Sequence, residues 1–286
     1  MTDTGNSGGI STISFTNQSG GVLTQAGEVN FQRLKSGGSG NDNGTITYNN
    51  QGTWIVDGNA AALNLRLRSA ASTVTLNLNN SGTLRGSGAN DVLEYTRFNT
   101  TGLAGTTGAV TGRALITNTG VVSPGAGHDG SGLTTVGQLT LRDLDLTFSG
   151  VDATLRLDIG GTGAGQFDVL SLADGLTSGS GAGALTLDGN SKLQLYYVNS
   201  FNPIADYSLT ILNYGSRTGA FDLLSNLSIF NATGDAANVA NYSITYNSGN
   251  AVLNFTAIPE PSTYALLGLG LGALWVLRRR NAPRAK

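Results

Sequence analysis

The 286-residue chain has no cysteine and only one histidine, His128. Without cysteine the protein cannot form disulfides, zinc–thiolate sites, iron–sulfur clusters or a thiol nucleophile, and one histidine leaves little scope for a multi-histidine metal site. Charge is also sparse, at 12% of residues, and three lysines offer no basic stripe for nucleic-acid binding. We therefore predict no cofactor, no metal site and no nucleic-acid partner.

Proline is rare as well, with 5 residues against 42 glycines, and the glycines show no three-residue period. These two features exclude a collagen-like chain. A hydrophobic content of 39% with a net charge of −2 also excludes a fully disordered one.

The charge that is present is unevenly distributed. Five of the 16 basic residues lie in the last nine positions, which contain no acid, so residues 1–277 carry 11 basic and 18 acidic side chains. An acidic body is thus followed by a basic tail, and this asymmetry is the first indication of function.

Most of the chain shows the two-residue period of β-strands that are covered on one face. Apolar and polar side chains alternate over residues 63–67, 74–78, 155–159 and 193–195, and Gly, Asn and Ser separate the short strands. No amphipathic helix is evident before Tyr264. We therefore predict an all-β body over residues 1–257.

A turn recurs along this body. Asn50, Asn80 and Asn118 each begin an Asn-x-Gly turn that leads into a strand, and Asn17 begins a looser copy, at spacings of 33, 30 and 38 residues. Such periods are typical of solenoids and propellers, and the unequal spacing disfavours matched propeller blades. We predict a right-handed parallel β-helix (a solenoid), with a β-sandwich as the alternative.

The residue types at this turn also have an explanation. Asn and Gly both tolerate left-handed backbone angles at low cost, which suits a corner. Stacked asparagines can in addition hydrogen-bond to one another along the stack, as amide ladders do.

Residues 264–277 form a stretch of 14 residues without charge. As a helix they would be about 21 Å long, shorter than a bilayer core of about 30 Å. Two prolines and a carboxylate precede them and cannot begin a helix deep in lipid. We predict a single short transmembrane helix with arginines on its cytoplasmic side, rather than a buried core helix. Its span consists of Tyr264, Leu266, Leu267, Leu269, Leu271, Leu274, Trp275 and Leu277, and its basic stop of Arg278, Arg279 and Arg280.

The run Pro259-Glu260-Pro261-Ser262-Thr263, a short Gly/Leu-rich span and an arginine cluster together resemble the PEP-CTERM sorting signal of Gram-negative bacteria. The resemblance implies export, a transient inner-membrane stage, recognition by an exosortase, and cleavage near Pro-Glu-Pro that sends the body to the cell surface or releases it. We expect the motif to be extended, because proline fixes φ and disfavours helix in the preceding residue. The chain then divides into a body (1–257), a processing motif (258–263), a membrane helix (264–277) and a basic cytoplasmic tail (278–286).

A second resemblance concerns the body. The stretches Val122-Ser123-Pro124-Gly125, GLTTVGQLTL, TLRLDIGGTGAGQFDVLSL and ALTLDGNSKLQLYYV are similar to passenger regions of autotransporter-type surface proteins with their β-strand repeats, over residues 110–225. This again implies a β-helix. Exported proteins of this kind carry a signal peptide, and residues 1–6 have no basic region or apolar run, so we expect a further segment upstream.

One pair of acidic residues could carry chemistry. Asp143 and Asp145 are two apart on a predicted strand and would point to one face, where paired carboxylates serve as acid and base or bind calcium. The simpler interpretation places Leu144, Leu146 and Phe148 in the core and both aspartates in water, because alternation alone predicts it. Arg142 would point to the opposite face.

Two glycine-rich segments offer weaker candidates. Residues 160–168 lack the following helix that a dinucleotide-binding loop needs, and they have Ala164 where a calcium-binding repeat needs aspartate, with Asp168 too late in the run. We predict a turn there. His128 and Asp129, near Ser123, resemble a fragment of a catalytic triad, but a flexible loop supports a catalytic histidine poorly.

Aromatic side chains gather near the end of the body. They could form a platform on which sugars stack, or they could close the end of the β-helix and cover its core, which is the commoner arrangement. The residues concerned are Tyr196, Tyr197, Phe201, Tyr207 and Tyr214.

The sequence therefore predicts a non-catalytic, exported cell-surface or matrix protein with a role in biofilm structure or adhesion. Its expected partners are an exosortase, the inner membrane during transit, and extracellular polysaccharide as a candidate ligand. The alternatives are a β-helix polysaccharide lyase or hydrolase that uses the Asp143/Asp145 face, and a protein that stays anchored in the membrane.

Overall fold

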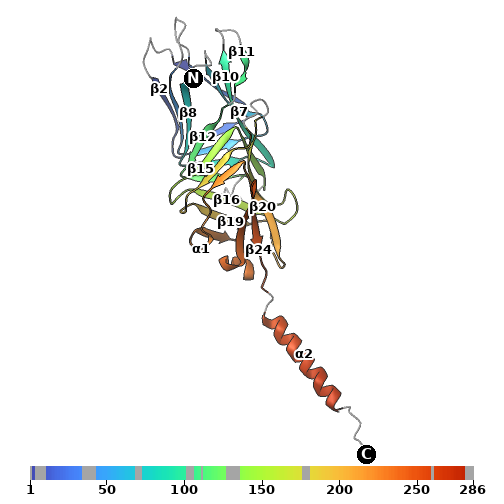
Figure 1. The fold of residues 1–286 in the computed structure, drawn as a ribbon. Helices are drawn as coiled ribbons and strands as arrows, with labels where there is room; N and C mark the ends of the chain where they lie inside the picture. The colour runs from blue at the N-terminus through green and yellow to red at the C-terminus, as the bar shows by residue number, and fades with distance from the viewer. Residues whose placement is uncertain are drawn as a thin grey trace, which may run out of the picture.

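The computed structural model shows an elongated, β-rich body, with a helix set apart from it toward the C-terminus (Figure 1). The structure describes residues 2–3, 11–33, 43–67, 73–100, 106–110, 112–126, 136–175, 181–258 and 261–280.

Three sheets form the body. Sheet B consists of β2 (Ser11–Asn17), β5 (Asn43–Asn50), β8 (Thr73–Asn80), β12 (Ala114–Asn118), β15 (Leu144–Phe148), β18 (Ala184–Leu187) and β21 (Ser216–Thr218). Sheet C consists of β3 (Val22–Gln25), β6 (Thr53–Val56), β9 (Thr83–Gly86), β13 (Val121–Ser123), β16 (Thr154–Ile159), β19 (Lys192–Tyr197) and β22 (Leu227–Phe230).

Sheet A is the largest. It consists of β1 (Thr2–Asp3), β4 (Glu28–Arg33), β7 (Ala61–Leu67), β10 (Asn90–Thr100), β11 (Thr106–Val110), β14 (Gln138–Arg142), β17 (Val169–Ala173), β20 (Tyr207–Asn213), β23 (Tyr242–Tyr246) and β24 (Asn250–Phe255). The helical elements are α1 (Leu223–Asn226), the 3-10 helices η1 (Gly234–Ala237) and η2 (Val239–Asn241), and α2 (Pro261–Arg280).

The chain visits sheets B, C and A in turn and then returns to B one layer further along. We call each such passage a coil; β5, β6 and β7 form one coil, and β8, β9 and β10 form the next. Strands of successive coils pair in parallel, as β5 does with β8 and β6 with β9. The predicted all-β class is confirmed, and the parallel sheets are compatible with a β-helix. They differ from the antiparallel sheets of the β-sandwich alternative.

The inner face of each coil is apolar. Leu155, Leu157 and Ile159 of β16 are fully buried, as the alternation predicts. Asp158 departs from the pattern, because it is buried as well. The chain folds back at this point and pairs antiparallel alongside the end of β16, where the Asp168 amide donates to the Asp158 carbonyl oxygen at 2.9 Å.

The predicted asparagine stack is confirmed at the corner between sheets B and C. The side-chain amide of Asn17 donates to Oδ1 of Asn50 at 2.8 Å, Asn50 donates to Asn80 at 2.6 Å, and Asn80 donates to Asn118 at 2.6 Å. Asn50, Asn80 and Asn118 are almost completely buried. The next residue in register is Phe148, where the stack ends.

The reason for glycine at this corner differs from the one predicted. Among the described residues, neither these asparagines nor Gly52, Gly82 and Gly120 have a positive φ. Their coils instead approach so closely that a Cβ added to Gly82 would lie 2.0 Å from the carbonyl oxygen of Gly52. Close contact between stacked backbones, rather than left-handed geometry, requires glycine here.

Replacing Asn80 with alanine is expected to lower the free energy of unfolding by about 2 to 4 kcal/mol, because it leaves buried polar groups of its neighbours without a partner. The lost bonds are those with Asn50 and Asn118, one to the Val121 carbonyl oxygen at 3.0 Å and a longer one to the Gly82 carbonyl oxygen at 3.4 Å. Denaturant unfolding of the purified protein measures the loss. Asn79→Ala is the control, since Asn79 bonds Asn49 on the exposed face; an equal loss in both variants would contradict the role of the buried stack.

The C-terminal end of the stack is covered differently. Strand β24 pairs antiparallel with β20 and with β23. Beneath them the hydroxyl of Tyr197 bonds those of Tyr207 and Tyr242, the latter at 2.6 Å. Tyr197, Tyr207 and Tyr214 are therefore buried at the end of the core rather than arranged as a platform, and Phe201 packs against the same core. Tyr196 differs, because it lies on the outward side of β19, partly exposed, and stacks on Phe230 with 4.3 Å between the ring centroids.

Candidate functional site

A helix, α2, lies where the sequence predicted a short transmembrane helix, but its bounds are wider than predicted. It begins at Pro261, three residues before the predicted start, and ends at Arg280, three residues after the predicted end. Proline suits the first turn of a helix, since its fixed φ is helical and its missing N–H is not needed there. Arginine is a good helix former and is favourable at the C-terminus of the helix dipole.

The prediction of an extended backbone across the Pro-Glu-Pro motif is wrong at Pro261, where α2 begins. Pro259 and Glu260 lie outside the described residues, and Pro261 to Thr263 are already helical. The side chains of Tyr264, Arg279 and Arg280 also lie outside the described set, whereas Arg278 is exposed.

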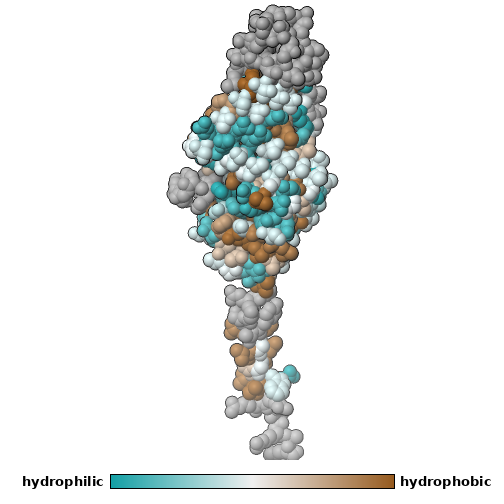
Figure 2. Space-filling view, turned by 90° about the vertical axis from the view of Figure 1, so that its left-hand side faces the viewer, coloured by the Kyte–Doolittle hydropathy of each residue, from teal (hydrophilic) through white to brown (hydrophobic). Residues whose placement is uncertain are grey.

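The apolar side chains of α2 are exposed along its length. Figure 2 shows them as brown atoms on the narrow segment beyond the body. Their exposed fractions run from 50% at Val276 to 72% at Leu269. The residues that fall on this surface are Leu266, Leu267, Leu269, Leu271, Leu274, Trp275, Val276 and Leu277. This arrangement contradicts the alternative of a helix packed in the core.

The length and apolarity of α2 also bear on its relation to a bilayer. Within the described part of the chain, no helix combines enough length and apolar character to cross a membrane.

Asp143 does not lie where the sequence predicts it. It occupies the corner between β14 and β15 with a φ of 53°, and it is buried. One interpretation of the sequence placed Asp143 on the same strand face as Asp145, and the simpler one placed it in water. Both are wrong. A tight corner at this position turns its side chain inward, where Oδ1 accepts from the Gly175 amide at 3.1 Å.

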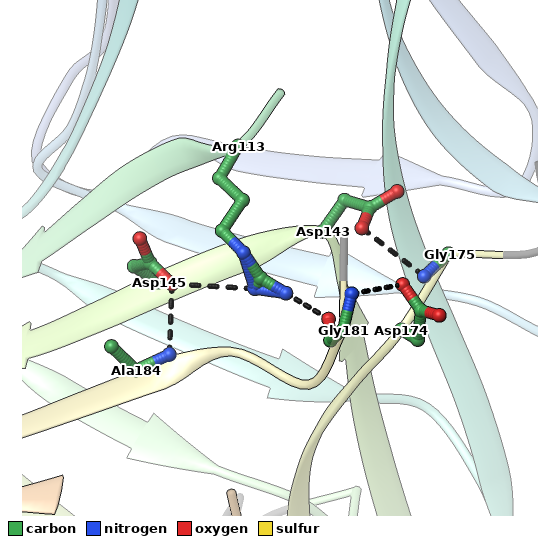
Figure 3. A network of polar contacts seen from close by, with 7 residues as sticks. All are labelled: Arg113, Asp143, Asp145, Asp174, Gly175, Gly181 and Ala184. Carbon is green, nitrogen blue, oxygen red and sulfur yellow. Dashed lines mark hydrogen bonds and ion pairs between the residues drawn. The ribbon is translucent and has the colours of Figure 1, made fainter. Parts of the chain in front are cut away.

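Asp145 lies on β15, and its carboxylate accepts a backbone hydrogen bond and pairs with an arginine (Figure 3). Its Oδ1 accepts from the Ala184 amide at 2.8 Å and pairs with the Arg113 guanidinium at 3.5 Å. Arg113 also donates to the Gly181 carbonyl oxygen, and Asp174 accepts from the Gly181 amide at 2.7 Å. Each carboxylate in Figure 3 thus holds a different backbone amide of the adjoining turns. Arg142, for its part, pairs with Glu94 at 3.8 Å.

The glycine-rich run forms a turn between β16 and β17, as predicted. Gly160 donates to the Gln166 carbonyl oxygen at 2.8 Å, and Gln166 donates back to Gly163 at 3.0 Å. Asp168 follows this turn and is fully buried. Its two oxygens accept from the amides of Gly137 at 2.7 Å and Asp158 at 3.0 Å, so the carboxylate joins two coils.

Asp168 makes the stability of the body dependent on pH. Burial and the neighbouring Asp158 carboxylate raise the pKa of Asp168 well above its ordinary 3.8, although hydrogen bonds from three amides oppose them. The unfolded chain therefore loses this proton at a lower pH than the folded chain does. The free energy of unfolding should accordingly fall as pH rises from about 4 toward the raised pKa.

Denaturant midpoints measured from pH 5 to 9 test this dependence, with Asp158→Asn as the comparison. The substitution removes the like charge, so we expect the decline with pH to be smaller in the variant. Parallel curves for the two proteins would contradict the coupling.

The last candidates from the sequence are His128, Asp129 and Ser123. His128 and Asp129 lie outside the described residues, and Ser123 is buried in β13. Among the residues that the structure describes, no three His, Cys, Asp or Glu side chains are grouped to hold a metal ion.

An apolar cavity of about 250 Å³ lies at the N-terminal end of the stack, beside Phe15, Tyr48 and Trp54. Sequence patterns do not predict this cavity, because its residues are far apart along the chain and meet only when the coils stack.

Comparison with known proteins supports the C-terminal segment as the functional one. A search of curated proteins finds no match to the chain. Residues 257–280 match the PEP-CTERM protein-sorting motif. The match begins at Ala257, two residues after the end of β24, and includes the Pro-Glu-Pro motif and α2 with its arginines. It indicates an exported protein that is targeted by an exosortase.

Proposed function

We propose that the protein is a non-catalytic component of the cell surface or extracellular matrix, whose body is a right-handed parallel β-helix. The tail directs the chain to the exterior and is then processed by an exosortase. The observation that supports this proposal most directly is the position of the matched motif. Most of the motif is an apolar helix that lies outside the body, and the core of the body is closed at that end by its own strands.

The structure of α2 suits a temporary role in the membrane. Its exposed leucines favour burial in lipid, at about 25 cal/mol for each Å² of apolar surface. Its arginines resist passage across the bilayer and hold its end on the cytoplasmic side. A helix with these features would hold the chain at the membrane until a processing enzyme cuts upstream of it.

The form of the body supports a structural role rather than catalysis. Asp143, Asp145 and Asp174 each accept a backbone hydrogen bond that fixes a turn, and catalytic carboxylates would instead need to face one substrate. Stacked coils with polar outer faces give an elongated surface that suits matrix assembly or adhesion, with extracellular polysaccharide as the ligand. The likeness to autotransporter passenger regions belongs to this proposal.

The test is to produce the chain in a Gram-negative host with its exosortase and in the same host without it. With the enzyme, we expect a shortened chain at the surface or in the medium. Without it, the full-length chain should remain with the inner membrane. The same mass and location in both hosts would refute processing and would favour a permanent anchor.

A further inference from the structure

The chain leaves the body through three residues whose backbone amides are all held. After β24, the Thr256 amide donates to the Asn241 carbonyl oxygen at 2.9 Å. The Ala257 amide donates to Oδ1 of Asp206 at 2.9 Å, and the Ile258 amide donates to Oδ2 of Asp235 at 3.0 Å. We call Asp206 and Asp235 the exit clasp. The clasp ends immediately before Pro259.

The two aspartates are positioned by the closed end of the core. Asp206 directly precedes Tyr207 of β20, which is buried in the tyrosine cluster. Asp235 lies in η1, whose Asp235 carbonyl oxygen accepts from the Asn241 side chain at 2.9 Å. The adjacent Ala236 carbonyl oxygen accepts from the Tyr242 hydroxyl at 2.7 Å. The clasp is therefore anchored from both sides, and Figure 1 shows the chain leaving the body below β20 and β24.

These hydrogen bonds limit which backbone amides a processing enzyme can bind. Enzymes that bind an extended substrate commonly pair with its backbone amides, as an added strand does. The amides of residues 256–258 are already bonded to the body, and Pro259 and Pro261 have no amide hydrogen.

We propose that Asp206 and Asp235 are positioning residues for processing: they tie the chain to the body up to Ile258 and confine the enzyme to the residues beyond it. This inference rests on the proposed exosortase processing and adds the point from which the chain is accessible. The exit clasp thus prevents cleavage at or before Ile258. It also keeps β24 paired with β20 while the enzyme acts.

The first measurement does not depend on the exosortase. Amide exchange of Ala257 and Ile258 is followed by NMR in the full chain in detergent, with ¹⁵N-labelled alanine and isoleucine. Asp206→Ala with Asp235→Ala should speed exchange of these two amides by about tenfold, the effect of losing partly exposed, charge-assisted hydrogen bonds. Asp206→Asn with Asp235→Asn keeps an acceptor oxygen at each position and should restore much of the protection.

Asp152→Ala is the control, because it removes an exposed carboxylate that pairs with Lys192 at the start of β19 and not with the exit segment. It should leave both amides unchanged. Rapid exchange of Ala257 and Ile258 in the wild-type chain, or identical exchange in the double alanine variant, would overturn the clasp.

The second measurement is the mass of the mature C-terminus in the exosortase-bearing host. The wild-type chain should end at one position beyond Ile258, and the double alanine variant should yield additional ends at or before Ile258. A single unchanged end in the variant would overturn the positioning role even if exchange had changed. An unprocessed wild-type chain with protected amides would instead refute the proposed function and leave the hydrogen bonds in place.

Discussion

Replacing Gly82 with alanine is expected to lower the free energy of unfolding by about 3 kcal/mol, because the added methyl group overpacks a tightly stacked corner. The Cβ would lie 2.0 Å from the Gly52 carbonyl oxygen and within 3 Å of two backbone atoms of Gln51. That oxygen also accepts from the Thr83 amide at 2.8 Å. Separating the two coils enough to fit the methyl group therefore strains a hydrogen bond that joins them.

Denaturant or thermal unfolding measures the effect, and Gly88→Ala is its matched control. A Cβ at Gly88 meets nothing within 4 Å, and this glycine has no positive φ. Alanine there should be neutral or stabilising by about 0.5 kcal/mol, because it restricts the unfolded chain. A Gly82 variant as stable as the Gly88 variant would show that the coils are not packed as described.

Replacing Pro259, Glu260 and Pro261 together with alanine is expected to abolish processing in an exosortase-bearing host. Alanine is the best helix former and the prolines that disfavour helix would be gone, so helix becomes favourable throughout this stretch between the body and α2. The glutamate, which is the one charge in that stretch, would be lost as well. Immunoblotting of cell fractions should show the full-length chain with the membranes and less than about a tenth of the wild-type amount of mature protein.

The control replaces Ser262 and Thr263 with alanine. These residues lie in the first turn of α2 and are adjacent to the motif. Because alanine keeps the helix, the mature protein should form at close to the wild-type level. Normal processing of the Pro-Glu-Pro variant would contradict the assigned motif.

Local patterns in the sequence predicted much of the fold. The alternation in residues 155–159 identified the buried face of β16, because inward and outward positions follow from the strand period alone. The Asn-x-Gly turns identified the stacking corner, because the same amide must recur in every coil to bond its neighbour. The charge asymmetry and the uncharged span likewise located α2.

Features that depend on contacts between distant residues were missed. The close approach that selects Gly82 is set by the neighbouring coil, so a single turn does not reveal it. Asp143 follows an alternating pattern but lies at a corner with positive φ, where the strand period no longer applies. Asp206 and Asp235 are separated by 29 residues from each other and reach the exit only because β24 returns to pair with β20.

The most direct test of the central claim is to locate and weigh the chain in its exosortase-bearing host. Intact cells are treated with a protease that cannot enter them, and the chain recovered before and after treatment is measured by mass spectrometry. The account predicts an externally accessible body that has lost α2 and its arginines. A full-length chain that is protected inside the cell would contradict it.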